Sequence, residues 1–198
     1  MQGRCAWTFA RLCNQYGNRR EWLDASKSCL DFLEEYCINR NAGGRLYFTV
    51  TADGKPLRQR RYCFSEAFYI MANLEYYGAT GDKTCLARAR KYYDFLYELN
   101  NGIIADPTGL GPKTIPETRK GRALADPMIF LNTTSIMRRY DAENGEKYDS
   151  YAEECAAAII KYHFKPELSC TLESVAPNGD AMLDNSAGRV VNPGHDIE

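Results

Sequence analysis

Hydrophobic side chains recur every three or four residues in six stretches of the chain, and polar or glycine-containing turns separate these stretches. This spacing is typical of amphipathic helices that pack one face against a core. Gly17, Gly81 and Gly145 lie at the turns, as expected next to helix ends. Helices are predicted at residues 6–16, 20–37, 65–80, 82–99, 127–142 and 148–164. The pattern therefore predicts three helical hairpins.

Two segments interrupt the helical pattern. The run LYFTVT at residues 46–51 is rich in β-branched and aromatic side chains and precedes Asp53-Gly54, a pair typical of tight turns. It predicts a short strand or hairpin arm between the first and second helix pairs. Residues 100–126 form a loop with several glycines and prolines between the second and third pairs. This loop is longer than most connections in compact domains, so we expect it to cover a site.

The first two hairpins share a sequence pattern. Leu23 and the segment DFLEE at residues 31–35 recur as Leu86 and DFLYE at residues 94–98, at a constant offset of 63 residues. A hairpin unit repeated around an axis predicts an all-α fold, here a partial (α/α)6 barrel, or α/α toroid, with short β-hairpin links. Three hairpins make half a ring, so we expect one incomplete barrel domain over residues 1–198. A solenoid of TPR-like repeats is the alternative, but the offset is about twice the length of that repeat.

The composition of the chain limits its partners and its compartment. Of 198 residues, 44% are hydrophobic and 26% charged, which is typical of a water-soluble globular protein. Lys and Arg number 25 and Asp and Glu 26, and this balance of charge favours neither nucleic acid nor anionic lipid as a partner. The sequence shows neither a membrane-length apolar run nor a secretory signal pattern at Met1. We therefore expect a cytoplasmic protein with no membrane or nucleic-acid partner.

The cysteines are scattered and form no Cys-x-x-Cys pair. Because the chain is long enough to bury a core unaided, we expect free thiols that act as small buried hydrophobes. Only His163 and His195 could join them in a metal site, so no metal is expected. The cysteines are Cys5, Cys13, Cys29, Cys37, Cys63, Cys85, Cys155 and Cys170.

His195 follows an Asn-Pro-Gly turn and is predicted to lie at the start of a helix. A histidine in such a place is a candidate general base, with a structural cap as the alternative. Glu198 comes three residues later, on the same helical face, and is a candidate hydrogen-bond partner of His195 or of a sugar hydroxyl.

Arg4 and Trp7 lie one helical turn apart and form a second candidate pair. One interpretation is a surface cation–π contact between the two side chains. The other places them on an inner helix of the barrel, where Arg4 would stabilise negative charge and Trp7 would stack on an apolar sugar face. The spacing alone leaves both open.

Short motifs along the whole chain resemble the N-acylglucosamine 2-epimerase family, whose members are also described as renin-binding proteins. The final motif is the most specific. The motifs are GRCAWTF at residues 3–9, FSEAF at 64–68, DPM at 126–128, NTT at 132–134, ESVAPNG at 173–179 and GRVVNPGHDIE at 188–198.

The resemblance implies the first half of an (α/α)6 barrel enzyme that inverts C2 of N-acyl-D-glucosamine and N-acyl-D-mannosamine through an enediolate. His195 matches one of the family's two acid/base histidines, and Arg4 matches its cavity arginine. The second histidine belongs to the half not present here, so this piece alone is expected to be nearly or fully inactive. The resemblance further suggests substrate-binding roles, with supporting or capping roles as alternatives, for Trp7, Glu66, Asn132, Asn192 and Glu198.

The resemblance also bears on cofactors and partners. It implies an amino-sugar substrate, a homodimer of the complete protein, and proton-transfer chemistry that requires no cofactor. ATP is a candidate allosteric effector, with residues 113–119 as its candidate contact. Sibling enzymes, the cellobiose 2-epimerases and aldose–ketose isomerases, are the first alternative. Those siblings carry a further histidine where this chain has Ile136, which favours the N-acyl sugar. A non-catalytic interaction scaffold is the second alternative.

Overall fold

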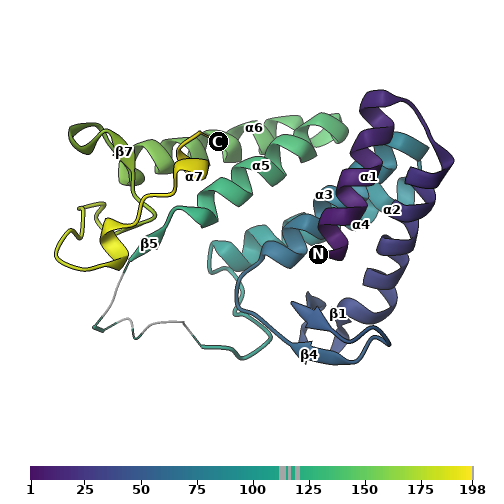
Figure 1. Cartoon of the computed structure of the whole chain (residues 1–198), viewed down its shortest axis with the longest axis horizontal. Helices are drawn as coiled ribbons and strands as arrows, with labels where there is room; N and C mark the ends of the chain where they lie inside the picture. Colours follow the sequence, from purple (N-terminus) through teal and green to yellow (C-terminus); the bar gives the residue numbers. More distant parts are fainter. Residues whose placement is uncertain (112–114, 116, 119–120, 198) are drawn as a thin grey trace. The chain divides into compact units, whose positions relative to one another are not determined.

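The computed structural model describes residues 1–111, 115, 117–118 and 121–197, and Figure 1 shows its elements. The chain divides into two compact units, each treated separately below. Unit 1 contains Met1–Gly111 and Ile136–Glu143, and unit 2 contains Pro112–Ser135 and Asn144–Glu198. The prediction of one domain over residues 1–198 stays a prediction.

Four complete helices build unit 1: α1 (Gln2–Tyr16), α2 (Arg20–Phe32), α3 (Phe64–Thr80) and α4 (Lys83–Asn100). Helix α1 packs along both α2 and α3, and α4 packs along α3 (Figure 1). The buried face of α1 consists of Gly3, Ala6, Ala10 and Cys13, small residues that let the neighbouring helices approach closely.

Helix α3 is the centre of unit 1. Its residues 66–75 are all buried except Phe68, which is half-buried. A helix that is buried on nearly all sides must be enclosed by its neighbours, and three other helices contact α3. Buried Glu75 ties α3 to its neighbours, because its carboxylate accepts hydrogen bonds from Asn14 at 2.7 Å, from Arg11 at 3.1 Å and from Tyr140 at 2.7 Å.

A short series of elements follows α2. The helix continues as a π-helical turn η1 (Leu33–Cys37), and β1 (Ile38–Asn39), the 3₁₀ turn η2 (Arg40–Ala42) and β2 (Arg45–Leu46) come next. Strands β1 and β2 pair antiparallel. A second hairpin pairs β3 (Thr49–Val50) with β4 (Pro56–Arg58) around the predicted Asp53-Gly54 turn. The run at 46–51 thus supplies arms to two hairpins.

Unit 2 repeats this series. Helix α6 (Gly145–Ala158) continues as a π-helical turn η4 (Ile159–His163), followed by β6 (Phe164–Lys165), the 3₁₀ turn η5 (Pro166–Leu168) and β7 (Cys170–Thr171). The interval from Leu33 to Ile159 is 126 residues, twice the 63-residue offset in the sequence. The repeat therefore extends to the third hairpin.

The rest of unit 2 positions the C-terminal segment. Helix α5 (Ala125–Tyr140) begins in unit 2 and ends in unit 1, and η3 (Ala142–Asn144) follows it. Strand β5 (Arg122–Ala123) pairs antiparallel with β8 (Ser174–Val175). The 3₁₀ turn η6 (Ala187–Arg189) and the short helix α7 (Pro193–Ile197) complete the described chain.

The helices confirm the predicted hairpins, with shifted ends. The first helix begins at Gln2 rather than residue 6, and the sixth begins at Gly145 rather than residue 148. Pro127 lies in the first turn of α5, as proline at a helix start allows. Within the described residues, no helix is both long enough and apolar enough to cross a membrane. All eight cysteines are free thiols.

We predict that Gly188→Ala destabilises the protein. Gly188 is buried, and a Cβ atom there would lie 2.1 Å from the carbonyl oxygen of Met182. The backbone must shift to accept it, so we expect the free energy of unfolding to fall by about 1–3 kcal/mol. Urea unfolding measures this change. Gly111→Ala is the matched control, because a Cβ there meets no atom of the described residues within 4 Å, and equal midpoints for the two variants would contradict the prediction.

Candidate active site

Arg4 lies in the first turns of α1, where this helix crosses α3. A Cβ atom on Gly3 would lie 3.1 Å from Cβ of Phe68 and 3.3 Å from its carbonyl carbon, so glycine permits this close approach. The approach places the guanidinium carbon of Arg4 4.2 Å from the centroid of the Phe68 ring. The Arg4 side chain is exposed. Arg4 therefore presents its N–H groups to solvent while an aromatic ring supports one face of the guanidinium.

Trp7 is half-buried one turn further along α1. Its ring centroid lies 6.2 Å from that of Phe68, and the side chain packs against the cluster of Ala6, Leu30 and Ala72. The indole Nε1 is buried, and no hydrogen-bond partner for it occurs in the part of the chain that the structure describes. Arg4 thus stacks on Phe68, which sequence reasoning missed. The stacking role of Trp7 on a sugar stays a prediction.

Glu66 lies in the first turn of α3 and is fully buried. Its Oε1 accepts hydrogen bonds from Arg45 Nε at 2.7 Å and from the Leu46 backbone N–H at 2.8 Å. Its Oε2 is buried and lacks a hydrogen-bond partner among the described residues. Oε1 of Glu66 therefore stabilises the fold by bonding to Arg45 and Leu46. The substrate-binding role of Glu66 stays a prediction, and only Oε2 would be available for it.

Arg45 connects its own strand, β2, to three other segments of unit 1: the start of α3 through Glu66, the loop at residues 60–62, and the loop that contains Asp106. The side chain is fully buried, and its Nη1 forms an ion pair with Asp106 Oδ2 at 2.6 Å, while Nη2 donates to the carbonyl oxygens of Arg60 and Tyr62. Burial disfavours its charge, but the carboxylates of Glu66 and Asp106 outweigh burial and raise the pKa of Arg45. The only hint of this buried cation in the sequence was the position of Arg45 directly before the apolar run at residues 46–51.

In unit 2, the Asn-Pro-Gly turn caps a helix as the sequence predicts. The exposed Asn192 accepts hydrogen bonds at its backbone oxygen from the N–H groups of His195 and Asp196, and at Oδ1 from Gly194. Helix α7 begins directly after it, at Pro193. Asn192 thus caps α7, which was the alternative to its predicted substrate-binding role.

His195 contacts a carboxylate that sequence reasoning did not select. Its Nδ1 lies 2.5 Å from Oε1 of Glu173. The His195 side chain is 32% exposed and that of Glu173 is 18% exposed. The expected partner, Glu198, lies outside the described residues. The ESVAPNG motif contained Glu173, but nothing in its spacing from residue 195 predicted a contact.

The remaining candidate in unit 2 is Asn132, which is exposed on α5 next to buried Thr133. The other histidine, His163, is buried, and its Nδ1 bonds to the Leu172 carbonyl oxygen at 2.9 Å. Burial lowers the pKa of His163 below its ordinary value. Because it lies away from solvent, His163 is a structural residue. Residues 113–119, the candidate ATP contact, lie largely outside the described residues.

The candidate residues therefore form two groups. Arg4, Trp7 and Glu66 belong to unit 1, and Asn132, Asn192 and His195 belong to unit 2. The structure describes each group within its own unit, and a common cavity for Arg4 and His195 stays a prediction. No cluster of three or more metal-ligating side chains occurs among the residues that are described.

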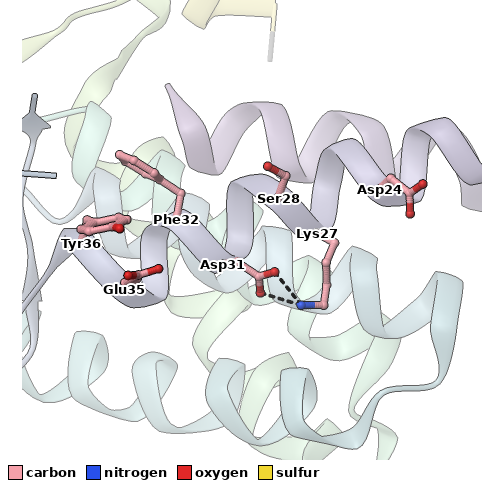
Figure 2. Close-up of a pocket in the computed structure, with 7 residues that line it drawn as sticks. All are labelled: Asp24, Lys27, Ser28, Asp31, Phe32, Glu35 and Tyr36. Carbon is pink, nitrogen blue, oxygen red and sulfur yellow. Dashed lines mark hydrogen bonds and ion pairs between the residues drawn. The ribbon is translucent and has the colours of Figure 1, made fainter. Parts of the chain in front are cut away.

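Figure 2 shows a hollow on the outer side of α2 that belongs to neither group. Among its lining residues, Lys27 and Asp31 form an ion pair at 2.6 Å, and the ring centroids of Phe32 and Tyr36 lie 5.0 Å apart. None of the candidate residues lines it. Its lining consists of Asp24, Lys27, Ser28, Asp31, Phe32, Glu35 and Tyr36.

Comparison with solved structures identifies the class of fold. The chain is similar to the structure of cellobiose 2-epimerase from Bacillus thermoamylovorans B4167, with a TM-score of 0.78 and 16% sequence identity over 92% of this chain and 49% of that one. At this identity the likeness concerns the fold alone. The fold is the alternating helical-hairpin architecture of an (α/α)6 barrel, of which this chain forms a part.

Sequence comparison then identifies the family. The family model for N-acylglucosamine 2-epimerase matches residues 1–198, and the chain belongs to that family. It is 32% identical to the N-acylglucosamine 2-epimerase of Rattus norvegicus over 200 residues, covering 100% of this chain and 46% of that protein. It is 31% identical to a cellobiose 2-epimerase of Ruminococcus albus over 94 residues, covering 48% of this chain and 24% of that protein. The chain spans about half the length of the curated relatives it matches.

Proposed function

We propose that the complete protein is a sugar epimerase that inverts C2 of N-acyl-D-glucosamine and N-acyl-D-mannosamine. One observation carries the proposal: His195, in the motif that contributes most to the family resemblance, has Nδ1 held by a carboxylate and a side chain that remains partly exposed. This leaves Nε2 for proton transfer, as a general base requires.

In the proposed reaction, His195 acts on the open-chain sugar. Nε2 takes the proton from C2, and the C–H electron pair becomes part of the C1–C2 double bond of an enolate. Because C2 of the N-acyl sugar bears the acylamino nitrogen, this enolate takes the place of the enediolate expected from the resemblance. Negative charge then develops on O1. A second acid/base group, from outside this chain, returns a proton to the opposite face of C2. The product is the C2 epimer, and no oxidation or reduction occurs.

Arg4 stabilises the charge on O1 in this proposal. Stacking on Phe68 limits the rotation of its guanidinium and leaves the N–H edge exposed. A positioned donor of this kind contributes most where charge develops in the transition state. Trp7, which is half-buried beside Phe68, would supply an apolar surface on which the sugar stacks.

The test uses protein expressed from the complete reading frame. We expect incubation with N-acetylmannosamine in D₂O to give N-acetylglucosamine that carries deuterium at C2, measured by ¹H NMR and mass spectrometry. Turnover of cellobiose with no exchange on the N-acyl sugar would instead establish the second candidate. The partial match to cellobiose 2-epimerases favours that candidate over other sugars. Failure with both sugars would contradict the epimerase proposal.

A further inference from the structure

Glu173 occupies a position that neighbouring segments fix from both sides. Its backbone N–H donates to the carbonyl oxygen of Val190 at 3.1 Å, and its carbonyl oxygen accepts from the Leu124 N–H at 2.9 Å. One residue earlier, Leu172 pairs with Val191 in an isolated antiparallel bridge. The main chain of Glu173 is therefore held between the start of α5 and the segment leading into α7.

The segment that bears His195 is anchored two residues before Glu173, at the end of β7. Asp196 Oδ1 accepts a hydrogen bond from the Thr171 backbone N–H at 2.9 Å. Asn192 closes the turn before α7 through its side chain and its backbone oxygen. The Thr171 contact therefore fixes the backbone next to His195, and the contacts with Val190 and Leu124 fix the backbone of Glu173. The Nδ1 to Oε1 distance of 2.5 Å joins two side chains whose backbones are both fixed.

This bond determines which imidazole nitrogen is available. A carboxylate accepts hydrogen bonds, so Nδ1 of His195 carries a proton when it bonds to Glu173. In the neutral ring, Nε2 then keeps its lone pair and faces away from Glu173. A carboxylate on the far nitrogen also sets the ring orientation, and at metal-binding histidines the loss of such a partner commonly costs about 10- to 100-fold in metal affinity or activity.

We infer that Glu173 is the positioning residue of His195, fixing its tautomer and its ring orientation. The catalytic part of this inference rests on the proposed function, whereas the tautomer is a property of the folded protein alone. Glu173 thus takes the part that sequence spacing suggested for Glu198.

The experiment compares Glu173→Gln with the wild type and with a matched control, all in the complete protein. Glu167→Gln makes the same chemical change at an exposed carboxylate of unit 2 that contacts neither histidine. The tautomer of His195 is read from the ¹⁵N shifts of its ring nitrogens, assigned by the signals that vanish in His195→Ala. We expect a protonated Nδ1 and an unprotonated Nε2 in the wild type and in Glu167→Gln.

In Glu173→Gln we expect this preference to be lost, because the glutamine amide can also donate to Nδ1 and so favour a proton on Nε2. Kinetically, we expect kcat to fall about 10- to 100-fold with little change in KM, since the change acts on the proton-transferring nitrogen. Glu173→Asp provides a second variant should the first fold poorly. It keeps the charge but withdraws the oxygen by about one C–C bond, roughly 1.5 Å, and we expect an intermediate kcat.

The outcomes separate the two proposals. A wild-type protein that shows the Nδ1–H tautomer but exchanges no C2 proton would defeat the proposed function and leave the structural pairing in place. Active wild type with an unchanged tautomer or unchanged kcat in Glu173→Gln would overturn the inference about Glu173.

Discussion

Replacing His195 by alanine is expected to slow deuterium incorporation at C2 of N-acetylmannosamine by about 10²- to 10⁴-fold, the usual cost of removing a positioned acid/base group. The side chain is partly exposed, and the turn before α7 is held by Asn192 and Asp196, so the fold should survive the change. The exchange rate in D₂O measures the effect. Because exchange reports proton removal directly, it detects the loss even where product release limits turnover.

His163→Asn is the control for this prediction. His163 is the other histidine of the chain, but it is buried and its Nδ1 bonds to the Leu172 carbonyl oxygen, a contact that an asparagine amide can reproduce. We expect it to lower the free energy of unfolding while exchange continues within about tenfold of the wild-type rate. Near-wild-type exchange in His195→Ala, or its loss only in His163→Asn, would rule out His195 as the base.

The helices of this protein could be predicted because their signal is local. The stripes of α1 to α6 repeat every three or four residues, and glycines mark the ends of α1 and α3. The π-helical turns η1 and η4 could not be predicted, because five residues of altered hydrogen bonding leave the apolar stripe intact. The strands are two or three residues long, too short for an alternating pattern to develop.

The site was predictable only where its residues are neighbours in sequence. Asn192 and His195 share one turn, so the motif showed their relation. The contact of His195 with Glu173 spans 22 residues and arises from pairing between Leu172 and Val191, which spacing along one helix does not reveal. Arg45 was missed for a different reason: arginine is rarely buried unless paired, and its partners lie far along the chain.

Arg45→Met is expected to cause the largest loss of stability. The arginine, fully buried, pairs with Glu66 at 2.7 Å and with Asp106 at 2.6 Å. Methionine fills much of the volume but leaves the Glu66 carboxylate buried with the Leu46 N–H as its one remaining partner among the residues that the structure describes. Removing one member of a buried ion pair typically costs about 3–5 kcal/mol, against a total stability of about 5–15 kcal/mol for a domain. Urea unfolding followed by circular dichroism measures the change.

Two further variants test whether the buried charge, rather than any arginine, is responsible. Arg20→Met changes an arginine whose side chain is 92% exposed and forms an ion pair with Asp24 one turn away, so we expect a loss of at most about 0.5 kcal/mol. Combining Arg45→Met with Glu66→Gln removes the stranded charge and should recover part of the loss, because a neutral amide is cheaper to bury than a carboxylate. Equal losses for Arg45→Met and Arg20→Met, or no recovery in the double variant, would show that the Arg45–Glu66 pair does not hold the start of α3.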